Sequence, residues 1–350
     1  MAERPDLARA RVLVTGGAGF IGSHFVHRLL ERFPQAHAVV LDALTYAGRR
    51  ENLDGLPPAR LTFVHGDIRD PAAVAGAMRG CDAVLNFAAE SHVDRSIEAP
   101  GAFIQTDVHG VFVLCEEARR ANVKRFVQVS TDEVYGEVLE GSATEAWPLQ
   151  PRSPYAASKA GGDRLAYAYA CTYGLPVVVT RCSNNYGPRQ YPEKLVPLFV
   201  TNALDDQPLP VYGTGTNRRD WIHVHDHCDA LLALLEQPGI EGETFNIGGG
   251  QERSVLEITD TLLGLLGKPH TLVRHVEDRP GHDRRYALDS AKLARVTGWR
   301  PRIAFADGIR DTVEWYRTHE AWWRPIKQGE FRAYYERMYG QRKVLGGVKA

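Results

Sequence analysis

The sequence lacks the features of several protein classes. It contains only 5 cysteines among 350 residues, and Cys81, Cys115, Cys171, Cys182 and Cys228 form no C-x-x-C pair. They predict unpaired thiols in a reducing compartment, with no disulfide and no metal centre. No run approaches the roughly 18 uncharged apolar residues of a membrane span, and the polar N-terminus lacks the apolar core of a signal peptide. We therefore expect a cytoplasmic protein without a membrane partner.

An excess of either charge is also absent. The chain has 42 basic and 43 acidic side chains, a net charge of −1 and a pI near 6.9, which argues against nucleic-acid binding through a basic face. The hydrophobic fraction of 44% and the charged fraction of 24% are typical of globular proteins and exclude disorder and fibrous repeats. The length suffices for one large or two modest domains.

Short apolar runs alternate with amphipathic segments in the first half. The runs lack period-two alternation, as is typical of strands covered on both faces, and they span residues 11–15, 38–42, 61–65, 83–88, 125–130 and 176–181. Helical patterns lie between them, including 21–32, 72–78 and 103–121. This rhythm predicts an α/β fold with a doubly wound parallel sheet and right-handed crossovers.

The rhythm changes after about residue 188. Residues 188–221 are rich in proline, glycine and aspartate. Beyond residue 188 we predict helices over 194–204, 226–236, 254–266, 290–297 and 305–318, and a short strand over 244–247. We expect a dinucleotide-binding domain over residues 1–188, its sheet completed by a strand near 243–249, and a smaller α+β substrate-binding region over 189–350.

A glycine-rich turn, TGGAGFIG at 15–22, joins the first predicted strand to a helix. Gly16, Gly19 and Gly22 let backbone N–H groups approach a pyrophosphate, and the helix N-terminus adds partial positive charge. Spacing alone also fits a tight packing turn. Asp42 closes the second strand, however, and a carboxylate there accepts both ribose hydroxyls and repels a 2′-phosphate. The context predicts a Rossmann-type site that favours NAD over NADP.

Asp67 follows the third predicted strand and fits two roles. With Ile68 it is placed to reach an adenine, and an aspartate here is equally typical of a turn or a helix cap.

Tyr155 and Lys159 stand four residues apart, on one face if the segment is helical. A nearby cation lowers the pKa of a phenol from about 10 toward neutrality. Tyr155 is therefore a candidate to take a proton from a sugar hydroxyl while hydride leaves the same carbon. The Y-x-x-x-K spacing is common in surface helices, so its meaning depends on the dinucleotide fold around it.

Two adjacent carboxyl groups, Asp132 and Glu133, follow the fifth predicted strand. Elimination of water needs one group to remove a carbon-bound proton and another to protonate the departing hydroxyl. Two carboxyls in different environments divide these roles through their pKa values. A bare D-E pair is otherwise typical of a solvent-exposed loop, and its position directly after Thr131 favours the catalytic interpretation.

Segments along almost the whole chain resemble the extended short-chain dehydrogenase/reductase superfamily and, within it, the dTDP-glucose 4,6-dehydratase family. They are the glycine turn, DALTYAG at 42–48, AAESHVD at 88–94, TDEVYG at 131–136, the Tyr155/Lys159 pair, SNNYGP at 183–188, RDW at 219–221 and DRPGHDR at 278–284. The resemblance implies dehydration of dTDP-glucose to dTDP-4-keto-6-deoxyglucose with internally recycled NAD.

The same resemblance implies a role for each site residue. Tyr155 would remove the C4 hydroxyl proton as hydride passes to NAD; Glu133 would remove the C5 proton as Asp132 protonates the C6 hydroxyl, and the hydride would return to C6. Thr131 would bind the C4 oxygen, and Lys159 the nicotinamide ribose. The implied cofactor contacts are Gly16, Gly19, Phe20, Ile21, Gly22, Asp42, Thr45, Asp67, Ile68, Ala88, Ala89, Thr106, Tyr155, Lys159 and Asn185. The implied substrate contacts are Ser91, Thr131, Asn184, Lys194, Leu195, Pro210, Tyr212, Arg219, Asn246, Asp278, Arg279 and His282.

The expected partner is a nucleotide-diphosphate sugar, with dTDP-glucose favoured, and a homodimer is expected through helices 103–121 and 152–173. Three alternatives stay open: the same chemistry on a UDP-, CDP- or GDP-hexose, a nucleotide-sugar 4-epimerase, which has no use for Asp132 and Glu133, and a non-catalytic dinucleotide-binding protein. His223, His225 and His227 alternate as metal ligands can. We prefer a strand end leading into a helix, because the chemistry needs no metal.

One position departs from the superfamily pattern. Asp107 stands where an asparagine is common; a carboxylate accepts hydrogen bonds as an amide does but donates none unless protonated. This puts a proton-relay role of the position in doubt. The aromatic and basic stretch after Trp315 is expected only to pack.

Overall fold

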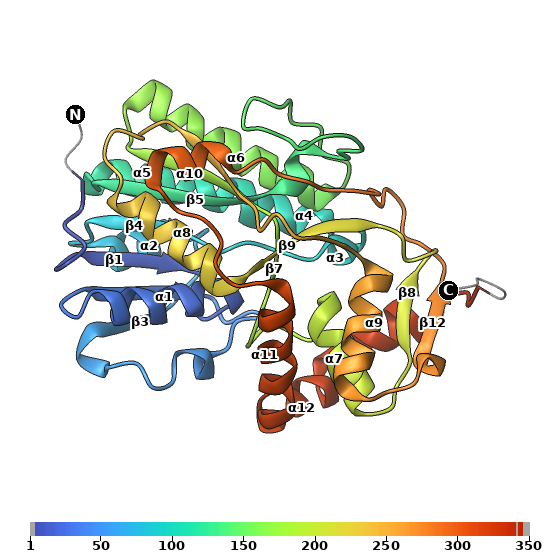
Figure 1. Cartoon of the computed structure of the whole chain (residues 1–350). Coiled ribbons are helices and arrows are strands. Elements are labelled where there is room, and N and C mark those ends of the chain that lie inside the picture. Colours follow the sequence, from blue (N-terminus) through green and yellow to red (C-terminus); the bar gives the residue numbers. More distant parts are fainter. Residues whose placement is uncertain (1–3, 341, 346–350) are drawn as a thin grey trace.

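A parallel sheet of seven strands, in the order β10-β6-β5-β4-β1-β2-β3, forms the centre of the computed structural model, which describes residues 4–340 and 342–345 (Figure 1). Its strands are β1 (Arg11–Thr15), β2 (His37–Asp42), β3 (Leu61–His65), β4 (Ala83–Asn86), β5 (Arg125–Thr131), β6 (Val177–Cys182) and β10 (Thr244–Ile247). All the pairings in this sheet are parallel. The predicted Rossmann-type, doubly wound fold is confirmed.

Helices cover both faces of this sheet. Val12 and Val14 pack with α1 (Phe20–Arg32) and α8 (Val224–Glu236), while Leu13, between them, packs with α2 (Pro71–Met78), α5 (Val111–Ala121) and α6 (Pro154–Tyr173). Successive strand residues point to opposite faces, so burial on both sides explains why these strands are continuously apolar.

Three elements beyond residue 188, β10, α8 and α10 (Ala291–Thr297), belong to the dinucleotide-binding side. Strand β10 pairs with β6 at the edge of the central sheet. Helix α8 lies against α1. Two ion pairs join them, Arg28–Asp229 at 2.7 Å and Arg32–Glu236 at 2.6 Å. The chain therefore returns to the first sheet after entering the second lobe.

The second lobe lies beside the central sheet and has an aromatic-rich core (Figure 1). Its strands form a three-stranded sheet, β11-β9-β7, and a pair, β12-β8. Their bounds are β7 (Asn184–Tyr186), β8 (Leu209–Tyr212), β9 (Arg218–His223), β11 (Glu252–Ser254) and β12 (Val273–Val276). The helices of this lobe are α7 (Leu195–Leu204), α9 (Val255–Leu266), α11 (Phe305–Thr318), α12 (Glu320–Gln328) and α13 (Glu330–Tyr335).

The predicted helix over 103–121 is not one regular helix. The chain passes from α3 (Val93–Glu98) and α4 (Pro100–Phe103) into a π-helical segment, Ile104–Gly110, before α5 begins. This segment runs close to α6, because a Cβ added at Gly162 would lie 2.2 Å from the carbonyl oxygen of Asp107. The Asp107 side chain is buried here, so the irregular segment turns a carboxyl group inward.

Strand β4 ends at Asn86, two residues before the predicted boundary at Ala88. From there the chain runs beside the glycine turn, where a Cβ added at Gly16 would lie 2.7 Å from the Ala88 amide nitrogen. Within the described ranges no helix is both long and apolar enough to span a membrane.

Candidate active site

A cavity of about 330 Å³ lies at the carboxyl ends of the central strands. Every residue that the sequence analysis assigned to the cofactor lines it, and so do all the predicted catalytic residues, Thr131, Asp132, Glu133, Tyr155 and Lys159. This is the edge at which doubly wound folds bind ligands. The sheet therefore brings together residues separated by more than a hundred positions in the sequence.

Two glycines of the turn, Gly16 and Gly22, have no space for a side chain. Gly16 has a φ of +65°, and a Cβ added at Gly22 would lie 2.4 Å from the Gly16 carbonyl oxygen. Helix α1 begins after Gly19 with no side-chain cap and no acidic residue in its first turn. Its first N–H groups and its positive end therefore face the cavity, as a pyrophosphate requires.

Asp42 joins the glycine turn to the loop after β2. Its carboxylate accepts the Ala18 amide at 2.9 Å and the Leu44 amide at 2.8 Å. Burial raises the pKa of Asp42, and these two backbone hydrogen bonds oppose the increase. A carboxylate has further lone pairs, so Asp42 keeps capacity for ribose hydroxyls.

Asp67 serves in a turn, which is one of its two predicted roles. It accepts the Arg69 amide at 2.8 Å and pairs with the Arg69 guanidinium at 2.6 Å, which lowers the pKa of Asp67. The cap of α2 is Asp70, whose side chain accepts the Ala72 amide. Asp67 still lines the cavity, beside Arg69, which the sequence analysis did not single out.

These features fit a bound dinucleotide. The glycine cradle and the uncapped helix supply donors for phosphates, and Asp42 supplies acceptors for a ribose. The hydroxyl of Ser130, buried in the cavity wall, has no hydrogen-bond partner among the described residues. Ser130 was missed from sequence, although its place directly before Thr131 was a usable signal.

Helix α6 carries the Tyr155/Lys159 pair. It begins at Pro154 after Ser153, whose hydroxyl caps it by accepting the Ala156 amide at 3.1 Å. The Lys159 ammonium donates to the Val129 carbonyl at 2.8 Å, which fixes the side chain against β5.

The expected lowering of the Tyr155 pKa is wrong for this structure. Burial, followed by the negative charges of Glu133 and Asp107, raises the pKa of Tyr155 well above its ordinary value. Removal of water from the phenol is the largest cause of this increase.

Thr131 and the two carboxyl groups sit on one tight turn. Thr131 ends β5, its hydroxyl oxygen accepts the Glu133 amide at 3.3 Å, and the hydroxyl donates to Asp132 at 3.1 Å. Residues Asp132–Tyr135 form a single 3₁₀ turn. The turn ends at Gly136, where φ is +72° and a Cβ would lie 2.3 Å from the Gln150 carbonyl oxygen.

The environments of Asp132 and Glu133 differ in their charges. Burial and then the negative charge of Glu133 raise the pKa of Asp132 well above its ordinary value, with Arg219 as the one cation that opposes the increase among its main causes. Burial also raises the pKa of Glu133, but the cations Arg279, Arg219 and Lys194 oppose that increase. Asp132 is thus favoured as the protonated acid and Glu133 as the carboxylate.

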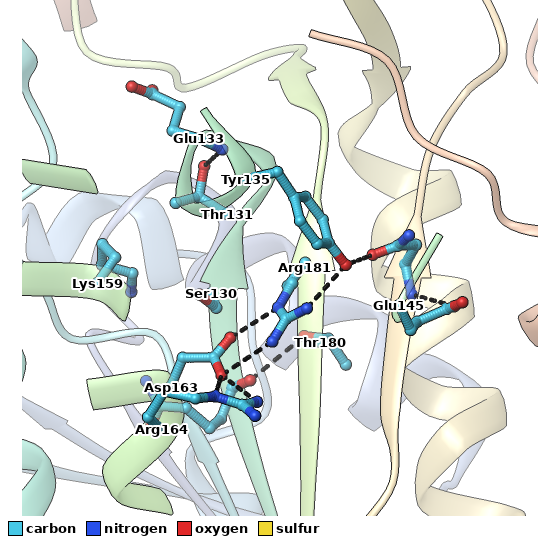
Figure 2. Close-up of polar contacts among 12 residues, drawn as sticks. Ser130, Thr131, Glu133, Tyr135, Glu145, Lys159, Asp163, Arg164, Thr180 and Arg181 are labelled. Atoms are coloured by element: carbon cyan, nitrogen blue, oxygen red, sulfur yellow. Dashed lines mark hydrogen bonds and ion pairs between the residues drawn. The ribbon is translucent and has the colours of Figure 1, made fainter. Parts of the chain in front are cut away.

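A buried polar network supports this turn from behind (Figure 2). Asp163 on α6 accepts Arg181 at 2.8 Å, and Arg181 donates to the Tyr135 hydroxyl at 2.8 Å. Tyr135 in turn donates to the side-chain oxygen of Asn246 at 2.8 Å. Because α6 also carries Tyr155 and Lys159, Arg181 joins the catalytic helix to the turn that carries the two carboxyl groups.

The predicted substrate residues divide into three groups. Ser91, Thr131, Asn184 and Lys194 line the cavity, and Lys194 donates to the Ser91 carbonyl. Arg219 and Arg279 lie outside this lining but close enough to act on the charge of Glu133. The others that lie away from the lining are Leu195, Pro210, Tyr212, Asn246, Asp278 and His282.

Several of these outer residues have protein partners of their own. The Tyr212 hydroxyl donates to Asp94 at 2.8 Å, and Arg279 pairs with the same carboxylate at 3.6 Å. His282 bonds Asp278 at 2.6 Å. Tyr212 and Arg279 therefore meet at Asp94, and the His282 ring lies edge-on to the Tyr212 ring.

Asn246 is placed differently from the prediction. It is fully buried, its side-chain oxygen accepts Tyr135, and its side-chain nitrogen donates to the Ala143 and Asp289 carbonyls. These bonds occupy the amide within the protein. In this structure Asn246 supports the catalytic turn and does not face the cavity.

The three alternating histidines end β9 and begin α8. The His223 ring accepts the His225 amide at 3.3 Å, His225 lies 3.1 Å from a ring nitrogen of His24, and His227 lies 2.9 Å from the Asn185 side chain. Each ring thus has a protein partner. The described residues contain no cluster of side chains suited to holding a metal ion.

Comparison with known proteins matches this architecture. The family model described as GDP-mannose 4,6 dehydratase matches residues 13–312. A dTDP-glucose 4,6-dehydratase from Streptomyces niveus is 52% identical over 322 residues, covering 91% of this chain and 96% of the relative. The dTDP-glucose 4,6-dehydratase 1 of Escherichia coli is 45% identical over 362 residues, covering 95% of this chain and all of the relative.

Solved structures of similar proteins share the fold. The dTDP-glucose 4,6-dehydratase DesIV from Streptomyces venezuelae, with NAD and TYD bound, is 55% identical, with a TM-score of 0.88 over 91% of this chain and 100% of that chain. A UDP-glucose 4-epimerase from Thermus thermophilus, in complex with NAD, is 37% identical, with a TM-score of 0.82 over 88% of this chain and 99% of that chain.

Proposed function

The chain belongs to the dTDP-glucose 4,6-dehydratase family, and from this premise we propose that it is an NAD-dependent hydro-lyase that converts dTDP-glucose to dTDP-4-keto-6-deoxyglucose. The observation that carries the proposal is the divided environment of Asp132 and Glu133, next to Tyr155 in one cavity. A redox reaction alone needs only Tyr155, Lys159 and Thr131. Two carboxyls in different charge environments add the acid and the base of an elimination.

The first step is oxidation at C4. Bound NAD supplies an acceptor that takes a hydride from C4 and returns it to C6 later in the cycle. Tyr155 accepts the C4 hydroxyl proton. The Thr131 hydroxyl, which donates to Asp132 in this structure, turns to donate to the C4 oxygen. The positive charge of the oxidised nicotinamide would offset the burial that raises the pKa of Tyr155.

The second step is loss of water. A ketone at C4 acidifies the C5 proton, which Glu133 removes, while Asp132 gives its proton to the C6 hydroxyl and the C6–O bond breaks. When C6 has been reduced, Glu133 returns its proton to C5. Tyr155 has then gained a proton and Asp132 has lost one, so exchange between them and solvent restores the starting state.

The cations around Glu133 suit a nucleotide diphosphate. Lys194 lines the cavity, Arg219 and Arg279 lie beside Glu133, and the buried Nε of Arg279 has no hydrogen-bond partner among the described residues. Arginine binds phosphate oxygens through two parallel donors. We assign these three side chains to the diphosphate. The other predicted substrate contacts stay proposals, with Tyr212 placed to pack on the base.

The test is incubation of the purified protein, without added NAD, with dTDP-, UDP-, CDP- and GDP-hexoses. Product mass and NMR are then measured. The proposal predicts loss of one water from dTDP-glucose. Turnover of another nucleotide alone would correct the base, and an unchanged mass with inverted C4 would indicate an epimerase. No turnover even after NAD is added would favour a binding protein.

We also propose a homodimer formed through the π-helical segment with α5 and through α6. These helices expose large apolar side chains: Ile104 is 49% exposed, Phe112 42%, Tyr167 39% and Tyr173 55%. Apolar surface of this kind marks protein interfaces. Sedimentation should show a dimer that Phe112→Glu dissociates and that Leu265→Glu, on α9, leaves intact. A monomeric wild type, or a dimeric Phe112→Glu variant, would contradict this interface.

A cytoplasmic location is proposed on chemical grounds. All five cysteines are free thiols, as expected in a reducing compartment. Cell fractionation, with recovery in the membrane or secreted fraction as the contrary outcome, tests this location.

A further inference from the structure

The C-terminal helices, for which the sequence suggested only packing, contact the cofactor side of the molecule. On α12, the Trp322 indole donates to the Asn52 side-chain oxygen at 3.0 Å. The Asn52 side-chain nitrogen donates at 2.9 Å to the carbonyl of Ala18, and Asn52 is 1% exposed. Ala18 belongs to the glycine turn, so one buried side chain joins α12 to the phosphate cradle.

A second contact runs from α13 to the loop after β2. The Arg95 guanidinium lies between two aromatic rings, 3.8 Å from the ring centre of Tyr46 and 4.1 Å from that of Tyr334. Arg95 also pairs with Glu193 at 2.9 Å, and the Tyr46 hydroxyl donates to Glu193 at 2.7 Å. The Glu193 side chain is 1% exposed and the Arg95 side chain 24% exposed, so the carboxylate of this ion pair is held inside the protein.

Both contacts act on the segment that follows β2. Tyr46 lies between Thr45 and Ala47, which line the cavity, and Glu193 precedes Lys194 in the cavity wall. The backbone N–H of Arg49 also donates to the Ala18 carbonyl at 3.0 Å. The segment from Asp42 to Asn52 is therefore held against the glycine turn from one side and against the C-terminal helices from the other.

We propose that α12 and α13 act as a clasp that retains NAD, by holding the 42–52 segment closed over the ribose and the pyrophosphate. This inference rests on the proposed function, because a cofactor that is regenerated in every turnover has no need to leave. A segment opens more often when its buried contacts are removed. Loss of a clasp contact should therefore speed release of the cofactor, whatever the rate of the chemistry.

Three substitutions test the clasp in the full-length holoenzyme. Trp322→Phe removes the donor to Asn52 and keeps an aromatic ring, and Tyr46→Phe removes the donor to Glu193. Trp323→Phe is the matched control, because its buried indole donates to the Tyr316 carbonyl within the C-terminal core at 2.8 Å. All three variants lose one hydrogen bond of similar kind, but only the first two touch the 42–52 segment.

The measurement is the rate at which bound NAD leaves when the enzyme is diluted into an excess of an NAD-degrading enzyme. We expect release about tenfold faster in Trp322→Phe and Tyr46→Phe, as the loss of one buried hydrogen bond implies, and a wild-type rate in Trp323→Phe. The clasp would be overturned if NAD left all four proteins at the same rate, or if Trp323→Phe released it as fast as the other two variants. A wild-type protein that retains no NAD would also overturn it. Release is read without substrate, so a protein that holds NAD through these contacts but dehydrates no sugar would refute only the proposed function.

Discussion

The Asp107 carboxylate accepts a hydrogen bond of 2.7 Å from the hydroxyl of Ser158, which on helix α6 directly precedes Lys159 and lies about one turn after Tyr155. Its other oxygen accepts the Glu90 amide at 2.9 Å, so Asp107 joins the loop after β4 to the catalytic helix. Burial raises the pKa of Asp107 to about 6, against the attraction of Lys159 and these hydrogen bonds. The residue that departs from the superfamily pattern is therefore a titratable group beside the catalytic pair.

Asp107→Asn should move the pH dependence of catalysis. The negative charge of Asp107 helps to raise the pKa of Tyr155, and an asparagine removes that charge while still accepting the Glu90 amide. The acidic limb of kcat/KM, which reports the essential base of the free enzyme, should shift to lower pH by on the order of half to one unit. Initial rates with dTDP-glucose across the pH range measure the shift.

Ser158→Ala is the control for this experiment. It removes the hydrogen bond to Asp107 and leaves the charge, so its acidic limb should stay where the wild-type limb lies. If Asp107→Asn also leaves the acidic limb in place, the charge of Asp107 does not affect the pKa of Tyr155 during catalysis.

Asp107→Asn should also stabilise the protein at neutral pH. The pKa of about 6 in the folded chain exceeds the ordinary 3.8, so the folded state binds this proton more tightly than the unfolded state. The free energy of unfolding therefore falls as pH rises from about 4 to about 6. Above about pH 6 the burial of the charged Asp107 has its full destabilising effect. Denaturant unfolding should show the variant more stable by about 1–3 kcal/mol at neutral pH, with the difference vanishing near pH 4. A difference independent of pH would mean that it arises from packing.

The sheet was predictable because its strands are apolar on both faces. Val12 and Val14 face one helix layer and Leu13 the other, and this removes the alternation that a half-exposed strand would show. Element ends were less accurate, because capping residues look helical in sequence. Ser254 was assigned to a helix, for example, whereas it is the N-cap of α9 and forms a capping box with Glu257.

The gathering of the proposed cofactor residues in one cavity was predictable for a topological reason. Parallel strands bring their carboxyl ends to one edge, so motifs that follow strands must meet there. The substrate half depends on how the second lobe sits against the sheet, which local periodicity does not encode. Asn246 shows this, because only the fold reveals that Tyr135 and two carbonyls occupy its amide. The bond between Trp322 and Asn52 crosses 270 positions and has no local signal.

Glu133→Gln should separate oxidation from elimination. The amide cannot remove the C5 proton, whereas Tyr155, Thr131 and Lys159 remain in place for C4 oxidation. We expect overall turnover to fall about 100-fold to 10,000-fold, with a 4-keto sugar that still has its C6 hydroxyl trapped by chemical reduction. Tyr155→Phe is the matched comparison and should form no ketone. Dehydrated product at a near-native rate from either variant would contradict the assigned roles.

Tyr135→Phe should weaken the elimination step without touching the reacting atoms. The substitution removes the hydroxyl that accepts Arg181 and donates to Asn246, so the turn that carries Glu133 loses its support while Asp163 still holds Arg181. C5 proton removal should become slower relative to C4 oxidation, and the isotope effect with C5-deuterated substrate should rise. Tyr169→Phe is the control. It removes a hydroxyl on α6 that donates to Glu116 on α5, away from the Arg181 network, and should leave that isotope effect unchanged. Tyr135→Phe loses two hydrogen bonds and Tyr169→Phe loses one, each worth about 1 kcal/mol. A rise in the isotope effect confined to Tyr135→Phe, with both variants folded, would reflect positioning of Glu133. An equal change in both would remove the basis for this role.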